Sequence, residues 1–140
     1  MATLKISDLS VGDWVQNDYG NYVKVAGIWQ GSNFNYHVDI HRNGVIGTIL
    51  PCNLHPTPIT AEILEKNGLF RHERDADNPE LIVLSNHFIM ARTYTDVDWW
   101  RVLIYDEEFP SKELFNGIIY SVHQLQHALR LAGVDKEINL

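Results

Sequence analysis

Two histidines near the end of the chain have the residue type and spacing that most directly suggest chemistry. His123 and His127 are four residues apart, the spacing of the zinc-binding pair in H-E-x-x-H metalloproteases. The residues between them read Gln-Leu-Gln, so the glutamate that would act as general base is absent. On a helical wheel both histidines lie opposite the apolar stripe, beside Gln126 and Arg130. The pattern predicts a solvated or partner-facing pair, with a metal site as the alternative.

A second candidate group lies on a predicted strand. His37, Asp39 and His41 alternate with apolar residues and therefore share one face of that strand. Adjacent members should lie about 6.6 Å apart and the outer two about 13 Å, given a strand rise of about 3.3 Å per residue. One metal ion could bridge neighbours but hardly all three, so the triad predicts the polar outer face of a hairpin.

Two further pairs resemble catalytic patterns in sequence only. Asp96 and Asp98 form a D-x-D pattern, but no glycine-rich phosphate loop accompanies it, and aspartates commonly hydrogen-bond their own backbone in turns. Cys52 has His55 three residues further on, which makes a Cys–His nucleophilic pair conceivable. Serine nucleophile elbows, Walker loops, C-x-x-C pairs and Rossmann glycines are missing from the sequence. We therefore predict a protein without enzymatic activity, catalytic residues, cofactor or metal.

Aromatic residues on short strands are better candidates for binding. Trp99 and Trp100 are neighbours on a predicted strand, so their side chains should point to opposite faces. Trp29 lies at a loop edge near Tyr36. Exposed tryptophan and tyrosine often anchor protein interfaces, although both are also common in cores. The predicted binding residues are Trp29, Tyr36, Trp99, Trp100, His123 and His127.

The elements that position these residues begin with a β-rich region. Residues 4–56 read as four or five short strands separated by turn residues, and Arg42-Asn43-Gly44 supplies the positive φ that a tight hairpin needs. Within this region Phe34 to Ile40 alternates between apolar and polar residues. We expect a small curled antiparallel sheet, for which an SH3-like barrel is one form.

Residues 57–140 predict an α+β unit within the same compact chain. Thr60 can cap a short helix that ends at Asn67-Gly68. The segments 81–84, 87–94 and 99–106 read as strands, Asn116-Gly117 as a turn, and residues 135–140 as a final short strand. Between them, the period changes at 121–133 to that of an amphipathic helix with Ser121 as cap and Gly133 as stop. The fold class expected is α+β.

Composition restricts the partners. The net charge of the 140 residues is −7, and most of it falls on residues 57–140. Lysine and arginine do not gather into a stripe that could neutralise phosphates, so duplex nucleic acid is not an expected partner. The single cysteine excludes an intrachain disulfide, and no apolar run has the length of a signal peptide or a membrane span. We expect a cytoplasmic protein that does not enter membranes, while the oligomeric state is left open.

Three stretches together resemble one family. The run Val122 to Gly133 with Asp135 to Ile138 is similar to the C-terminal signature of small uncharacterised proteins from Bacteroidetes genomes and their phages or prophages. Pro58 to Gly68 resembles their connector helix, and Leu9 to Val15 with Tyr22 to Val25 their N-terminal β segment; residues 70–116 correspond to the variable part. The resemblance implies a phage or prophage context and carries over no activity or site.

Three functional hypotheses follow. The first is a non-enzymatic protein-binding or assembly factor whose partner is a host or phage protein. The second is a protein that binds or sequesters a small nucleotide-like ligand, which requires a pocket of about 300–1,000 Å³ with convergent polar groups. The third is a metal hydrolase that uses the histidine pairs, and bound metal would be its mark.

Overall fold

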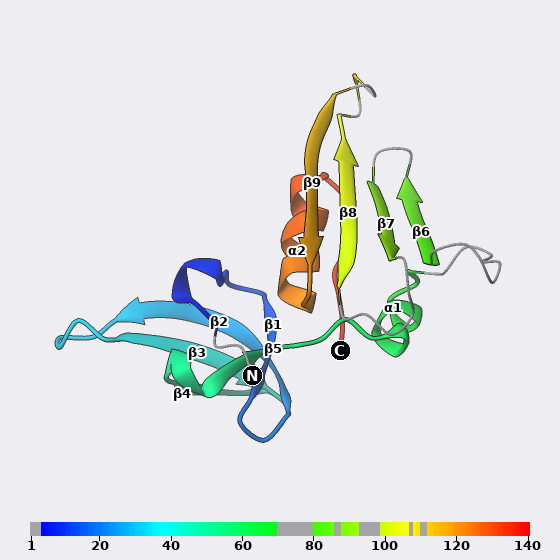
Figure 1. Cartoon of the computed structure of the whole chain (residues 1–140). Helices are drawn as coiled ribbons and strands as arrows, with labels where there is room; N and C mark the ends of the chain where they lie inside the picture. The colour runs from blue at the N-terminus through cyan, green and yellow to red at the C-terminus, as the bar shows by residue number, and fades with distance from the viewer. Residues whose placement is uncertain (1–3, 70–79, 86–87, 93–98, 107, 110–111) are drawn as a thin grey trace. The chain divides into compact units, whose positions relative to one another are not determined.

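The computed structural model describes residues 4–69, 80–85, 88–92, 99–106, 108–109 and 112–140. It confirms the α+β prediction: two antiparallel sheets are accompanied by a short helix and a C-terminal helix (Figure 1). The chain divides into two compact units, the first formed by residues 1–57 with 121–123 and 140, and the second by residues 58–120 and 124–139. The predicted D-x-D pair, Asp96 and Asp98, lies outside the described residues.

The sheet of the first unit has five strands in the order β4-β3-β2-β1-β5. Its strands are β1 (Trp14–Asn17), β2 (Tyr22–Gln30), β3 (Tyr36–Arg42), β4 (Val45–Ile49) and β5 (Leu54–Pro56), with short 3-10 turns η1 (Ile6–Asp8) and η2 (Pro51–Asn53). All neighbouring pairs are antiparallel. Because β4 and β5 are the two edges, the sheet is not a closed barrel, and the SH3-like barrel expected as one form is not present.

The β3–β4 hairpin forms where the sequence predicts it. Asn43 and Gly44 both have positive φ, 51° and 81°, as a two-residue turn between right-twisted strands requires. Arg42 therefore pairs with Val45, and the register continues inward from that pair. The other long hairpin is less regular, since β2 and β3 shift register between Val25 and Gly27. Such a bulge increases the local twist of a strand.

The first core is small and lies on one face of this sheet. Its buried members are Leu4, Leu9, Val15, Val23, Val25, Val38 and Leu54, with Ile6, Ile28, Ile40 and Ile49 packed against them. On β3 only the face of Val38 and Ile40 contributes to this core. The predicted alternation of Phe34 to Ile40 is thus confirmed over β3, and the opposite face remains open.

The second unit begins with α1 (Ala61–Lys66), whose ends match the sequence expectation. The Thr60 hydroxyl accepts a hydrogen bond from the Ile63 amide at 3.2 Å. At the other end Gly68 has φ of 70°, and the Leu69 amide donates to the Leu64 carbonyl at 2.8 Å. This closure of the last turn is typical of a helix that ends in a left-handed glycine.

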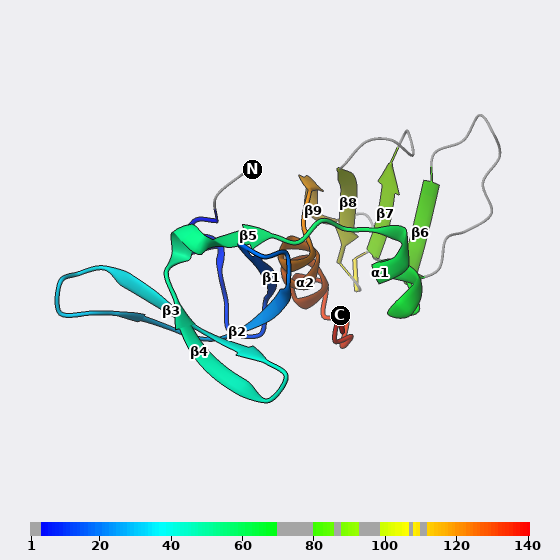
Figure 2. The same cartoon turned by 90° about the horizontal axis from the view of Figure 1, so that it is seen from below.

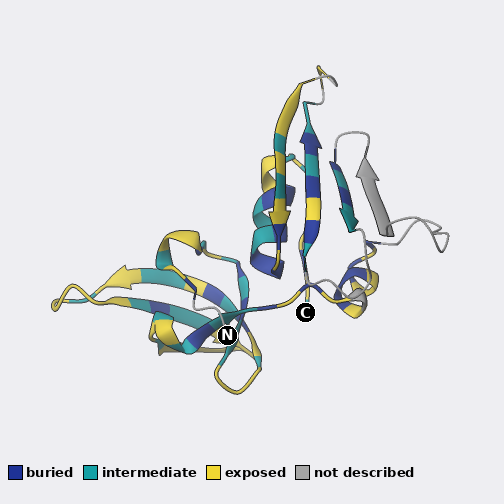
Figure 3. Cartoon of the chain, viewed as in Figure 1, coloured by how far each residue is buried: buried dark blue, intermediate teal, exposed yellow. Residues whose placement is uncertain are grey.

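Four strands form the second sheet, in the order β6-β7-β8-β9. They are β6 (Glu80–Ser85), β7 (Phe88–Arg92), β8 (Trp100–Tyr105) and β9 (Glu113–Ile119), and α2 (Val122–Leu131) follows them. Burial alternates along β8, and the exposed and buried residues can be followed in Figure 3. Helix α2 lies along one face of this sheet (Figures 1 and 2) and stops as predicted, with Gly133 at φ of 71°.

Two predicted features of this unit are wrong. Asn116-Gly117 is not a turn but lies inside β9, where Gly117 pairs with Val102. A Cβ on Gly117 would lie 2.7 Å from Cζ of Phe115, so the glycine makes room for that ring rather than reversing the chain. Residues 135–140 do not form a strand. Their backbone is held instead by the Asn67 amide, which accepts from the Asn139 N–H at 2.7 Å and donates to the Asn139 carbonyl at 2.9 Å.

Candidate functional site: the open face of the first sheet

The face of the first sheet that points away from its core gathers polar and aromatic side chains from three strands. The β2–β3 register pairs Trp29 with His37 and Gly27 with Asp39, and the β3–β4 register pairs Asp39 with Thr48. Residues that are paired across strands share a face. We call this set of five residues, Gly27, Trp29, His37, Asp39 and Thr48, the Trp29 face.

Trp29 is exposed and yet fixed in place. Its side chain is 44% exposed, but its ring stacks on the imidazole of His37 with centroids 4.3 Å apart and planes 16° from parallel. The indole Nε1–H also donates a hydrogen bond to Oδ1 of Asp39 at 3.1 Å. An aromatic side chain held by both stacking and a hydrogen bond loses little conformational entropy when a partner covers it.

Asp39 is the polar centre of the face. Besides the indole N–H, its Oδ1 accepts a hydrogen bond from the Thr48 hydroxyl at 2.9 Å. The hydrogen bond from Trp29, then that from Thr48, stabilise the charged form and lower the pKa of this carboxyl below its ordinary value of 3.8; nearby His37 contributes in the same direction. At neutral pH the Trp29 face therefore presents a fixed carboxylate beside an indole.

Two glycines shape the surroundings of these side chains. A Cβ on Gly27 would lie 3.5 Å from Oδ2 of Asp39, so the glycine leaves that oxygen uncovered on the β2 side. A Cβ on Gly31 would lie 3.1 Å from Nε2 of His37, tighter than ordinary packing allows. Gly31 therefore lets the imidazole lie over the start of the β2–β3 loop while it stacks on Trp29.

The same open face continues toward β1, where it carries a positive charge beside a second tryptophan. Trp14 pairs with Lys24, and Lys24 pairs with His41. The Lys24 ammonium lies 5.6 Å from the centroid of the Trp14 ring, a cation–π distance. The predicted His37–Asp39–His41 triad is thus confirmed as one polar strand face. Among the described residues, no group of three or more His, Cys, Asp and Glu side chains is placed to hold a metal ion.

The other predicted binding residues belong to other surfaces of their own units. Tyr36 is 45% exposed, but it precedes His37 on β3 and so points to the opposite side of the sheet. Trp99 and His127 are partly exposed residues of the second half of the chain, one just before β8 and the other on α2. Trp29 and Tyr36, two predicted binding residues of the first unit, therefore lie on opposite faces of its sheet.

Two of these residues are buried: for His123 this corrects the expectation of a solvated or partner-facing side chain, and for Trp100 it leaves no exposed ring for the predicted binding role. Trp100 is 1% exposed, and the guanidinium carbon of Arg92 lies 4.6 Å from its ring centroid. His123 is 3% exposed, and its Nδ1 is 2.9 Å from the Ser121 hydroxyl. The helical wheel failed for His123 because it assumes one buried stripe along the whole helix, whereas Val122, His123 and Leu125 are all buried in the first turn.

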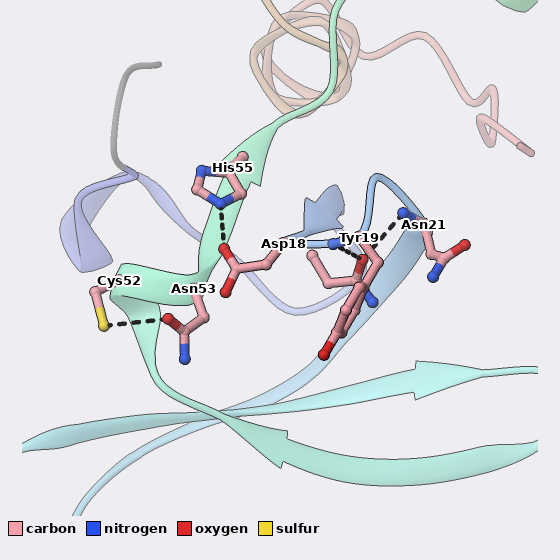
Figure 4. A network of polar contacts seen from close by, with 7 residues as sticks. Asp18, Tyr19, Asn21, Cys52, Asn53 and His55 are labelled. Carbon is pink, nitrogen blue, oxygen red and sulfur yellow. Dashed lines mark hydrogen bonds and ion pairs between the residues drawn. The ribbon is translucent and has the colours of Figure 1, made fainter.

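An aspartate–histidine pair elsewhere in the first unit, which sequence spacing did not reveal, is shown in Figure 4. Oδ1 of Asp18, in the β1–β2 turn, lies 2.6 Å from Nε2 of His55 on β5. The other ring nitrogen, Nδ1, is buried and has no hydrogen-bond partner among the described residues, so it has no open path to a substrate proton. The nearby thiol of Cys52 contacts the Asn53 side chain at 3.7 Å rather than this pair. The arrangement links turn to strand and does not form a nucleophile–base pair.

A hollow lies on the core side of the first sheet. It has a volume of about 490 Å³ and is lined by Asn17, Val23, Ile40, Arg42, Asn43, Val45 and Gly47. Arg42 makes no ion pair with any described residue. The hollow therefore combines apolar walls with one guanidinium and two amides.

No protein-family model, curated protein or solved structure shows a significant match to this chain. The resemblance to Bacteroidetes and phage proteins therefore stays a prediction. Within the described ranges, no helix has the length and apolar character needed to cross a membrane.

Proposed function

We propose that this chain is a non-enzymatic protein-binding module and that the Trp29 face is its binding surface. The observation that carries the proposal is the exposed but immobilised indole of Trp29, stacked on His37 and hydrogen-bonded to Asp39. Tryptophan is among the residues most enriched where interfaces gain their binding energy. A rigid aromatic on an open sheet face supports binding rather than catalysis.

The charge of the face supports a protein partner over nucleic acid. Asp39 is ionised at neutral pH, and the chain as a whole carries −7. Phosphate groups would be repelled from such a surface, because nucleic-acid affinity depends on neutralising phosphates. The proposed partner is therefore a cytoplasmic protein of the host or of the phage.

The test selects binding peptides from a displayed random library on the immobilised full chain and then measures their affinity by fluorescence anisotropy. We expect Trp29→Ala to weaken binding by about tenfold or more, equivalent to about 1.4 kcal/mol. Tyr36→Ala is the matched control, since Tyr36 has the same exposure on the opposite face. Failure to select any peptide, or equal loss with both variants, would overturn the assignment.

A second candidate function is favoured by the hollow around Arg42. Its volume of about 490 Å³ lies within the range of small-molecule sites, and Arg42 could pair with an anionic group while apolar walls hold a base or ring. We expect a nucleotide that binds there to raise the melting temperature of the chain, and Arg42→Ala to remove the increase. A flat response across a nucleotide panel eliminates this candidate.

A further inference from the structure

Asp39 uses only one of its two carboxylate oxygens. Both hydrogen bonds, from the Trp29 indole and the Thr48 hydroxyl, end on Oδ1. Within the described parts of the chain, no hydrogen bond or ion pair ends on Oδ2, and across from it stands Gly27, which has no side chain to cover it. The two hydrogen bonds to Oδ1 fix the carboxylate in place and leave Oδ2 free to accept a hydrogen bond from a partner.

The indole supplies a second recognition element beside that oxygen. His37 covers part of the Trp29 ring by stacking, and the side chain still keeps 44% of its surface exposed. A π face and a carboxylate held together are complementary to a cation, because the ring quadrupole and the charge both attract it. The hydrogen bond from Nε1–H to Oδ1 fixes the spacing between the two elements.

We infer that the Trp29 face recognises an arginine side chain of the protein partner, whose guanidinium lies against the Trp29 indole and donates to Oδ2 of Asp39. This inference rests on the proposed protein-binding function and names the chemistry of its partner. Arginine fits better than lysine because its planar guanidinium can stack on an aromatic ring and still direct N–H donors at a carboxylate in its own plane. A lysine ammonium could make either contact strongly but has no flat surface to stack.

Other charged groups on the open face limit what can bind next to that arginine. Lys24 lies across from His41, one step along the sheet from Asp39, with its ammonium directed over Trp14. A second positive charge on the β1 side of Asp39 would face Lys24 and be repelled. The site therefore suits a single arginine without a second positive charge next to it on that side.

Nuclear magnetic resonance on the full chain can test this with a defined probe. The probe is a short Gly/Ser peptide with one central arginine, and its control carries the neutral isostere citrulline at that position. We expect the arginine peptide, at millimolar concentration, to shift the Trp29 indole N–H resonance in a saturable way. Replacing the arginine with citrulline should weaken binding by about tenfold or more, because citrulline keeps N–H donors but loses the charge that strengthens both the hydrogen bond to Oδ2 and the contact with the ring.

Variants of the chain assign the effect to named atoms. Asp39→Asn keeps the shape of the side chain and removes its charge, so the arginine peptide should lose its advantage over the citrulline peptide. Should Asp39→Asn disturb folding, Thr48→Val provides a second route: it removes one donor to Oδ1 and leaves Oδ2 charged, so arginine preference should persist.

The outcomes distinguish failure of the arginine inference from failure of the proposed protein-binding function. No saturable shift with arginine, an equal shift with citrulline, or full preference in Asp39→Asn overturns the arginine inference. A higher affinity for a lysine peptide also overturns it. If selected peptides still bind in a Trp29-dependent manner, the proposed function survives. If arginine shifts the Trp29 resonance but no selected peptide depends on Trp29, the proposed protein-binding function fails instead.

Discussion

At the scale of single residues, Asp39 organises the only described cluster in which an exposed tryptophan is held by both a ring stack and a hydrogen bond. Its pKa is lowered chiefly by the donors of Trp29 and Thr48. A depressed carboxyl pKa contributes stability that is present above the unfolded value of 3.8 and lost as pH falls through the folded value. The network is therefore intact at neutral pH and weakens only in acid.

The hydrogen bonds to Asp39 can be tested by titrating its carboxyl carbon with nuclear magnetic resonance. We expect the wild-type pKa to lie below 3.8 and to rise toward that value in Trp29→Phe combined with Thr48→Val, because both donors are removed. Tyr36→Phe, on the other face, should leave the titration unchanged. A wild-type pKa at or above 3.8 would contradict the described geometry.

Sequence reasoning reached part of this cluster. The alternation of His37, Asp39 and His41 is visible in the sequence, and Thr48 could have been found by counting back from the two-residue turn Asn43-Gly44. The Trp29–His37 stack could not, because the bulge between Val25 and Gly27 and the longer β2–β3 loop hide the register. His123 was misplaced because a helical wheel carries no information on what surrounds a helix end.

At the scale of elements, a polar side chain takes the place of a strand partner for the backbone near residue 139. Asn67 is 8% exposed and bonds to the Ile63 carbonyl as well as to both backbone groups of Asn139. The sequence predicts a short strand at residues 135–140, but the backbone groups of Asn139 pair with a side chain, which a reading of local sequence cannot reveal. Asn67 therefore acts as a clamp that replaces a strand partner.

Removing the clamp should have a clear local effect. We expect Asn67→Ala to cost about 1–3 kcal/mol, because a buried side chain loses three hydrogen bonds, two of them to the backbone of Asn139. Amide hydrogen exchange at Asn139 should become fast. The control is Asn139→Ala, which removes a side chain that is not used in these bonds and should leave exchange slow. Slow exchange in Asn67→Ala would show that the clamp does not hold the terminus.

Edge strand β9 provides a second element-level test, since Gly117 was expected in a turn and lies in a strand. A methyl group at Gly117 would meet the Phe115 ring at 2.7 Å, so we expect Gly117→Ala to cost about 1–3 kcal/mol. In a Phe115→Ala background, Gly117→Ala should be neutral or stabilising. The ring that would clash with the new methyl group is then absent, and glycine is less favourable than alanine in a strand. Thermal unfolding of the four proteins measures this; equal costs in both backgrounds would refute the contact.

At the scale of the whole molecule, the α+β class and the order of most elements could be predicted because turns and helix ends are marked locally. Thr60 caps the helix that follows it, Asn43-Gly44 forms the turn at its own position, and Gly133 ends the helix before it. Whether the first sheet closes into a barrel could not be predicted. Closure would require β4 to pair with β5, and in the structure these strands are the two open edges. The candidate site depends on the β2–β3 register, which shifts between Val25 and Gly27, and it was therefore predicted only in fragments.

The measurement that tests the central claim most directly is the affinity of library-selected peptides for three forms of the full chain: wild type, Trp29→Ala and Tyr36→Ala. The account predicts a loss of about tenfold or more for Trp29→Ala and no change for Tyr36→Ala, because only the first lies on the organised face. Unchanged affinity in Trp29→Ala would contradict the claim that this face is the binding surface.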